Sequence, residues 1–229
     1  MNFCWIRSEE GVAVDWEFIW NDIYENQGEV QRDVLPTVEM IADLFQKENV
    51  KTVLDLGCGM GRHSIYLAKR DFAVTATDIS PKGIEVTARK AQQQGLNIIT
   101  VCHDFRNIPF ENDSFDAVLC VWTSGHGHKT DMIKSANEML RAAKQGGIIF
   151  VDYVSKQDSN YGRGTWIEKD TFIDNTPGEE DIPHHYMDAE ELSEIYSGYK
   201  HSIMPYTYSF CDDQNNTHHI EALLAVYRK

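Results

Sequence analysis

The stretch Val53-Leu54-Asp55-Leu56-Gly57-Cys58-Gly59-Met60-Gly61 joins a short apolar run to three glycines at alternate positions, and a helical pattern over 62–69 follows at once. Because glycine has no Cβ, the backbone can turn tightly here and lie against a ligand. A strand, a glycine turn and a helix in this order predict a nucleotide-binding turn. The spacing is GxGxG, and Arg62 stands where a dinucleotide fingerprint has its third glycine, which disfavours a pyrophosphate ligand.

Short β-branched runs alternate with longer helical patterns on both sides of this turn. Parallel strands need such helical crossovers. We therefore expect an α/β protein with a Rossmann-like, seven-stranded, mostly parallel sheet, helices on both faces and an antiparallel C-terminal strand. The expected strands are 52–56, 73–77, 97–101, 115–120, 147–154 and two late ones near 201–208 and 218–227, and the crossover helices are 62–69, 81–93 and 131–143.

Acidic residues end two further strands. Asp78 follows Gly57 by 21 residues, where a carboxylate can accept hydrogen bonds from two ribose hydroxyls. Asp104 could accept from an exocyclic amine, and Phe105 could lie against a purine face. An acid after a strand is more often a helix cap or a turn residue. The three signals nevertheless fall at the carboxyl ends of strands, where open α/β sheets bind ligands, so together they predict an adenosine pocket.

With these motifs the sequence resembles the class I S-adenosylmethionine-dependent methyltransferases over about 50–154. In that family the first strand ends in an acid and a glycine turn, the acid after the second strand holds the ribose, and the residues after the third hold the adenine. Beyond Val154 the chain is loosely similar to small-molecule members, including the tellurite-resistance type. The resemblance implies S-adenosyl-L-methionine as cofactor, bound by Asp55, Gly57, Cys58, Gly59, Gly61, Arg62, Asp78, Ile79, Asp104, Phe105 and Val121.

Two stretches depart from the alternating pattern. Residues 15–47 read as two helices with Trp16, Trp20 and Tyr24 at four-residue spacing, which predicts packing, with one of these aromatics as a candidate to close a ligand pocket. Residues 155–187 form a long connection rich in glycine and acids. Connections of this length in a compact domain are usually lids or binding loops. We expect one domain with a helical cap over 1–48, a cofactor-binding core, a lid over 155–187, and a last helix with two strands over 188–229.

The methyl acceptor is expected beside the loop after the fourth strand, which holds His126 between two glycines. Imidazole titrates near neutrality, so His126 is a candidate base or carbonyl-binding group, although a helix-entry loop with exposed histidines is the somewhat favoured alternative. His184 and Tyr186, at the end of the lid, are the other candidate catalytic residues. The paired histidines raise the possibility of a metal, but no acid stands at helical spacing from them, so no metal site is expected.

The net charge of −15 disfavours nucleic acids and anionic membranes as partners. No apolar run approaches the ~20 residues of a membrane span, and five scattered cysteines without a CxxC pair indicate reduced thiols. We expect a cytoplasmic monomer or homodimer with a small-molecule substrate. Residues 151–229 hold 15 acids and six bases, which favours a neutral or amine-bearing acceptor, although a solvated acidic face gives the same numbers.

Three functions remain open from the sequence. The leading one is transfer of a methyl group from S-adenosyl-L-methionine to a small molecule by in-line displacement. The second is that of a module that binds S-adenosyl-L-methionine in the same predicted pocket without catalysing a reaction. An NAD-dependent dehydrogenase on a similar fold is opposed by Arg62 in place of glycine.

Overall fold

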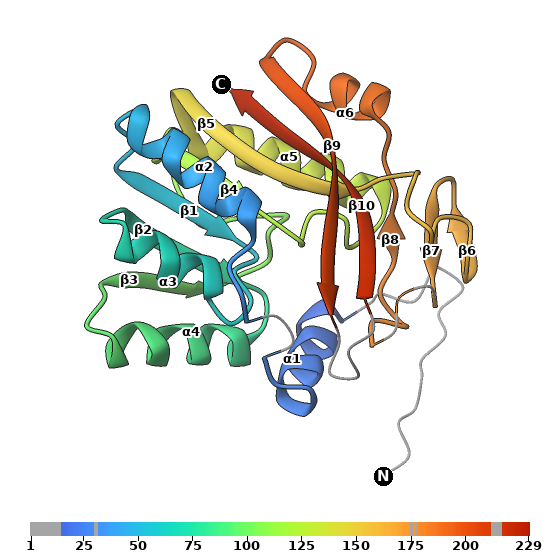
Figure 1. The fold of residues 1–229 in the computed structure, drawn as a ribbon, viewed down its shortest axis with the longest axis horizontal. Coiled ribbons are helices and arrows are strands. Elements are labelled where there is room, and N and C mark those ends of the chain that lie inside the picture. Colours follow the sequence, from blue (N-terminus) through green and yellow to red (C-terminus); the bar gives the residue numbers. More distant parts are fainter. Residues whose placement is uncertain (1–14, 30–31, 175, 177, 212–216) are drawn as a thin grey trace.

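The main sheet of the computed structural model contains β1 (Thr52–Leu56), β2 (Ala73–Asp78), β3 (Ile98–Cys102), β4 (Phe115–Cys120), β5 (Ala143–Val154), β9 (Lys200–Cys211) and β10 (Thr217–Arg228). The structure describes residues 15–29, 32–174, 176, 178–211 and 217–229. The strand order is β3-β2-β1-β4-β5-β10-β9 (Figure 1). The first five strands in this order are parallel, β10 is antiparallel to β5, and β9 is antiparallel to β10. The expected sheet is confirmed.

Helical crossovers connect the parallel strands as the sequence predicts. They are α3 (Arg62–Lys69), α4 (Pro81–Gln93) and α5 (Lys129–Ala142). Ser80 caps α4 by accepting a hydrogen bond from the Gly83 N–H at 3.1 Å, and Pro81 occupies the first helical position. These local signals explain why the first two helix bounds agree with the sequence expectation.

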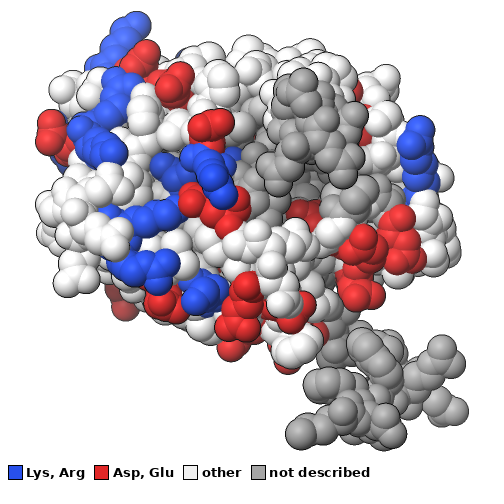
Figure 2. All heavy atoms as spheres, turned by 60° about the horizontal axis from the view of Figure 1, so that its bottom comes forward, with Lys and Arg blue, Asp and Glu red and all other residues white. Residues whose placement is uncertain are grey.

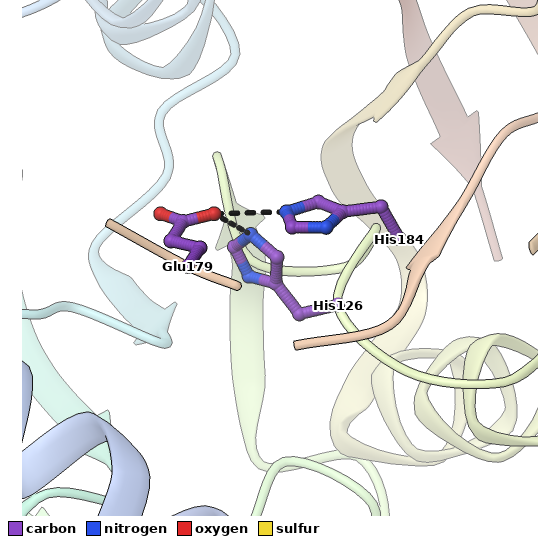
Figure 3. Close-up of side chains that lie close together, drawn as sticks. All are labelled: His126, Glu179 and His184. Carbon is purple, nitrogen blue, oxygen red and sulfur yellow. Dashed lines mark hydrogen bonds and ion pairs between the residues drawn. The ribbon is translucent and has the colours of Figure 1, made fainter. Parts of the chain in front are cut away.

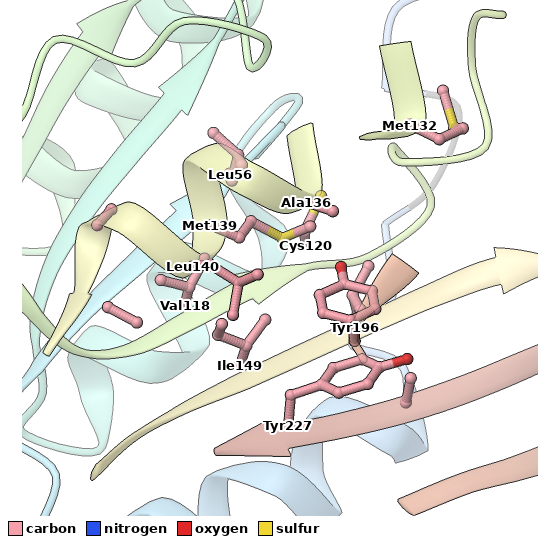
Figure 4. Close-up of a cluster of buried hydrophobic side chains, with 14 of the residues drawn as sticks. Leu56, Val118, Cys120, Met132, Ala136, Met139, Leu140, Ile149, Tyr196 and Tyr227 are labelled. Carbon is pink, nitrogen blue, oxygen red and sulfur yellow. The ribbon is translucent and has the colours of Figure 1, made fainter. Parts of the chain in front are cut away.

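Both faces of the sheet carry a buried core. On one face the side chains of Leu54 and Leu56 lie with α5, and on the other Val53 lies with the helix α2 (Pro36–Lys47). This alternation follows from the two-residue period of a strand. Figure 4 shows the first core, where the rings of Tyr196 and Tyr227 stack with centroids 3.6 Å apart. A sheet buried on both faces is the layer arrangement expected for crossover helices.

One strand begins earlier than predicted. We expected the fifth strand to start at Gly147, but β5 begins at Ala143, and its ladder with β4 shifts register between Phe115 and Ala117. A Cβ on Gly147 would lie 2.7 Å from the Lys144 carbonyl oxygen, so only glycine fits this irregular strand entry. The glycine we interpreted as a boundary is a bend within the strand.

Parts of the two irregular stretches cover the edge of this sheet where its parallel strands end, whereas α2 packs on one face. The first forms α1 (Trp16–Asn26) and α2, and the second forms a small sheet of β6 (Thr165–Glu168), β7 (Thr171–Ile173) and β8 (His184–His185) before α6 (Ala189–Ile195). Figure 1 shows α1 next to the ends of β9 and β10 that the chain joins at residues 211–217. These additions lie where the ligand is expected.

Positive and negative side chains are unevenly distributed over one face of the protein (Figure 2). On the face drawn in Figure 2, lysine and arginine side chains gather on the side of α3 and α4, with acids between them and toward the opposite side.

Cys58 and Cys120 are buried free thiols and Cys102 is an exposed one; Cys4 and the Cys211 side chain lie outside the described residues. None of the helices in the described part of the chain combines the length and apolar composition of a membrane span.

Candidate functional site

A cavity of about 380 Å³ opens at the carboxyl ends of β1, β2, β4 and β5. Its size lies in the usual range for small-molecule sites. Helix α1 and the 155–187 connection contribute walls to it. The predicted cofactor residues that line it are Gly57, Cys58, Gly59, Arg62, Asp78, Ile79, Phe105 and Val121, and the predicted catalytic residues His126, His184 and Tyr186 line it as well.

The backbone of the glycine turn adopts positive φ angles, which glycine accommodates most easily. Gly57, Gly59 and Gly61 have φ of +74°, +54° and +82°, a region that side chains with a Cβ disfavour. A Cβ on Gly57 would lie 2.2 Å from Cγ2 of Thr123, and one on Gly61 would meet the Thr87 side chain at 2.6 Å. Gly61 caps α3 and is absent from the cavity wall, so its part in the site is to shape the turn.

Asp78 lies at the floor of the cavity with its carboxylate held in place. Oδ2 accepts from the Gly59 N–H at 2.8 Å and Oδ1 from the Ser80 N–H at 2.9 Å. Burial raises the pKa of Asp78, and these backbone hydrogen bonds oppose that rise. Each oxygen keeps a further lone pair for a ligand hydroxyl. The geometry suits the ribose role expected from the sequence.

Asp55 does not reach the cavity. Its carboxylate is buried and accepts a hydrogen bond from the Ser64 hydroxyl at 2.5 Å, which ties the end of β1 to α3. Burial raises its pKa to about 6, against the effect of the Ser64 hydrogen bond. In this structure the Asp55 carboxylate positions the glycine turn, and its contact with the cofactor stays a prediction.

Asp104 also turns away from the cavity. Arg106 donates from its side chain to both carboxylate oxygens, with the closest pair 2.5 Å apart. Burial raises the pKa of Asp104, but the hydrogen bonds from Arg106 lower it overall. His103 and Phe105 line the cavity instead. The flat apolar contact predicted for Phe105 remains available, whereas the predicted hydrogen bond from Asp104 to an amine would require breaking this pair.

Arg62 brings a half-buried positive charge to the cavity wall. Its guanidinium lies over the Trp122 ring, 4.9 Å from the centroid. Burial lowers its pKa, while the nearby charges of Asp152 and Asp55 raise it. Arg62, which replaces the third glycine of the dinucleotide fingerprint, thus places a positive charge on the wall of a cavity large enough for a small-molecule ligand.

Sequence reasoning missed Asp152, which lies in β5 and lines the cavity. It accepts from the Trp122 N–H at 2.8 Å and from the Tyr208 hydroxyl at 2.7 Å. Burial raises its pKa to about 6. Trp122 has φ of +55°, an unusual conformation for a tryptophan that marks a strained turn at the end of β4. A lone acid inside a strand carries no sequence signal for such a role.

His126 and His184 meet Glu179 at the far side of the cavity (Figure 3). Oε2 of Glu179 lies 2.8 Å from Nε2 of His184 and 3.5 Å from Nε2 of His126. Burial raises the pKa of Glu179, but hydrogen bonds from the two imidazoles hold it below its usual range. We call these three residues the His-Glu-His cluster. Glu179 was missed because it is distant from His126 in sequence and lies in a loop.

The other residues of the acceptor side divide into lining and structural groups. Tyr186 is buried and lines the cavity, its ring 5.6 Å from that of Tyr161. His185, in contrast, is structural, with hydrogen bonds to Thr171 at 2.7 Å and Glu191 at 3.2 Å. His128 lies outside the cavity wall.

Helix α1 closes the cavity with aromatic side chains, as the sequence suggested for one of them. Trp20 lies 4.9 Å from the His126 ring, measured between centroids, and the Tyr24 hydroxyl lies over the glycine turn, 2.9 Å from the Cβ position of Gly59. Asn21 accepts from the Lys82 N–H at 2.9 Å, which fixes α1 to α4. The helix therefore spans from the predicted cofactor side to the predicted acceptor side.

Comparison with known proteins matches residues 53–147 to the family described as "Methyltransferase domain". A ubiquinone biosynthesis O-methyltransferase of Coxiella burnetii is 34% identical over 112 residues, 48% of this chain and 47% of the relative. The chain spans about half the length of the curated relatives it matches.

Solved structures share the fold over most of the chain. TehB from Haemophilus influenzae has a TM-score of 0.67 at 19% identity, over 92% of this chain and 67% of that one. A 1,6-didemethyltoxoflavin-N1-methyltransferase from Burkholderia thailandensis, solved with S-adenosylhomocysteine, has a TM-score of 0.64 at 15% identity, over 97% and 93%. The resemblance drawn from the sequence is confirmed for the fold over most of the chain and for a methyltransferase domain over residues 53–147.

Proposed function

Since residues 53–147 form a methyltransferase domain, we propose that the protein transfers a methyl group from S-adenosyl-L-methionine to a small-molecule acceptor. The observation that carries the proposal is the cavity itself. Its walls hold both the Asp78 carboxylate with the glycine turn and the His-Glu-His cluster. A donor site and an acceptor site thus share one cavity.

The residues present fit the cofactor. Asp78 offers two oxygens to the ribose hydroxyls, Ile79 and Phe105 offer apolar surface to the adenine, and Arg62 offers a cation to the carboxylate of the methionine part. When bound, S-adenosyl-L-methionine supplies a methyl group already activated by its sulfonium, so the protein mainly aligns the acceptor and excludes water. No phosphate has to be held, in agreement with Arg62 in place of the third glycine of a dinucleotide fingerprint.

We assign the acceptor to the space beside His126, His184 and Tyr186. The imidazole of His126 accepts the acceptor's proton, if it carries one, and Glu179 orients the ring. The Trp20 ring against His126 helps to exclude water from this side. The 155–187 connection acts as the lid, because it supplies both Glu179 and His184.

A small acceptor is favoured by the enclosed, aromatic cavity. Acids on its walls, such as Asp152 and Glu179, favour a neutral or amine-bearing molecule over an anionic one. The name of the Coxiella burnetii relative favours a hydroxyl as the methylated group, and that of the Burkholderia thailandensis protein a ring nitrogen. The cytoplasmic location and the monomeric or dimeric state stay predictions.

A turnover assay tests the proposal. Purified protein is incubated with methyl-tritiated S-adenosyl-L-methionine and fractionated metabolite pools, and S-adenosylhomocysteine and labelled product are measured together. The proposal expects both in equal amounts from at least one fraction. Tight cofactor binding with no S-adenosylhomocysteine from any fraction would contradict it and favour a module that binds the cofactor without catalysis.

A further inference from the structure

The His-Glu-His cluster has the donor set of a metal centre. Two imidazole nitrogens and one carboxylate oxygen, from the loop after β4 and from the 155–187 connection, lie within 4.8 Å of one another (Figure 3). Among the described residues it is the one group of three or more such side chains found this close. The same set, two histidines and one carboxylate, holds catalytic zinc in several enzymes and leaves further coordination positions open.

The two histidines are held in place by the backbone rather than by each other. The Gly127 N–H donates to the Pro183 carbonyl at 2.7 Å, and the His185 N–H donates to the Gly125 carbonyl at 2.9 Å. His126 and His184 therefore sit on two chain segments that are paired as a short antiparallel bridge. Preorganised ligands lower the entropic cost of binding an ion.

Two of the three donor–donor distances come close to those around a tetrahedral ion, and the third, between the two imidazole nitrogens, is at most 4.8 Å. An ion about 2.0–2.1 Å from each donor separates the donors by about 3.3–3.4 Å. The 3.5 Å between His126 Nε2 and Glu179 Oε2 already agrees. The 2.8 Å between His184 Nε2 and Glu179 Oε2 must open by about half an ångström, which rotation of the glutamate side chain allows.

Burial adds a second, independent observation. The His184 side chain is 8% exposed, and its Nδ1 has no hydrogen-bond partner in the described part of the chain. The buried side chain shields an ion at Nε2 from water, whereas Nδ1 lies on the other side of the ring and would take a water as its partner rather than the ion. Asp78 and Asp152, which line the same cavity, add negative charge that favours a cation.

We propose that His126, Glu179 and His184 bind one divalent ion of the zinc class, whose open position receives the methyl acceptor. The second half of this statement rests on the proposed methyltransferase function; the first half does not. The acceptor is then a phenolic or enolic hydroxyl. With the ion bound, His126 is a ligand and no longer the base. The acceptor's O–H bond breaks, the electron pair stays on the oxygen that binds the ion, and the proton leaves with the displaced water to solvent.

Metal binding is tested on untagged, metal-free protein titrated with Co²⁺, whose visible absorption reports tetrahedral coordination, and with Zn²⁺ in competition. The wild type is expected to bind one ion per chain. Glu179→Gln and His184→Ala are expected to weaken binding about 100-fold or more, because each removes a ligand. His128→Ala, a histidine 3.5 Å from Glu168 outside the cluster, is the matched control and should bind like the wild type.

Calorimetry with S-adenosylhomocysteine on the same metal-free samples separates the two proposals and shows that each variant is folded. Cofactor binding without the cobalt spectrum in the wild type would overturn the metal site and leave the methyltransferase proposal standing. Absence of both would overturn both. The proposal that the ion receives the methyl acceptor is tested with 4-nitrocatechol. Its absorption spectrum is expected to change with the zinc-loaded wild type and not with Glu179→Gln. No change with either protein would refute binding of the acceptor to the ion.

Discussion

Replacing Asp78 by asparagine tests the cofactor assignment at a single atom. Both carboxylate oxygens already accept one backbone N–H, from Gly59 and Ser80, so each can accept one more hydrogen bond from a ribose hydroxyl. A hydrogen bond to a charged group contributes about 1.5–3 kcal/mol. Losing one such bond raises the dissociation constant about 10- to 150-fold.

The assay is calorimetric titration with S-adenosylhomocysteine, with thermal unfolding of each variant measured alongside. Asp104→Asn is the matched control, since the Asp104 carboxylate is bound by Arg106 and does not line the cavity. The control should change the dissociation constant less than about threefold. Equal affinity of wild type and Asp78→Asn, or a larger loss in Asp104→Asn, would refute the assignment.

Three further variants probe the site and its scaffold. His126→Ala should lower turnover about 10²- to 10⁴-fold in steady-state assays while S-adenosylhomocysteine affinity stays within about threefold; unchanged turnover would remove His126 from the mechanism. Gly57→Ala places a Cβ 2.2 Å from Thr123 and should cost about 2–4 kcal/mol in urea unfolding, more than Gly95→Ala, whose Cβ meets nothing within 4 Å; equal costs would contradict the packing argument. Burial raises the pKa of Asp55 to about 6, above its ordinary value of 3.8. The folded state therefore favours the protonated carboxyl. This stabilisation is complete below about pH 4 and is lost as the pH rises through 6. Asp55→Asn should therefore gain up to about 3 kcal/mol of unfolding free energy relative to wild type between about pH 4 and 7, and parallel pH profiles would show that the raised pKa is wrong.

The sheet was predictable because its signals are local. The strand preceding Gly57, the cap at Ser80 and the crossover patterns each depend on neighbouring residues, and the structure agrees with them. Asp78 was predictable for the same reason, since the end of a parallel strand fixes where its side chain points.

The acceptor side was less predictable because it is assembled from distant segments. Glu179 and His126 are brought together by the folding of the lid, and no spacing in the sequence records this contact. Asp104 was assigned to the adenine, but a neighbouring arginine, Arg106, competes for its carboxylate. Asp152 is hidden within a strand that otherwise reads as core.

The central claim is that the cavity binds a nucleoside without phosphates. The most direct measurement is calorimetric titration of the wild-type protein with S-adenosylhomocysteine, followed by the same titration with NAD. Saturable binding of one S-adenosylhomocysteine per chain, with no heat from NAD, is the expected result. No heat from S-adenosylhomocysteine at millimolar concentration, or tighter binding of NAD, would contradict the account.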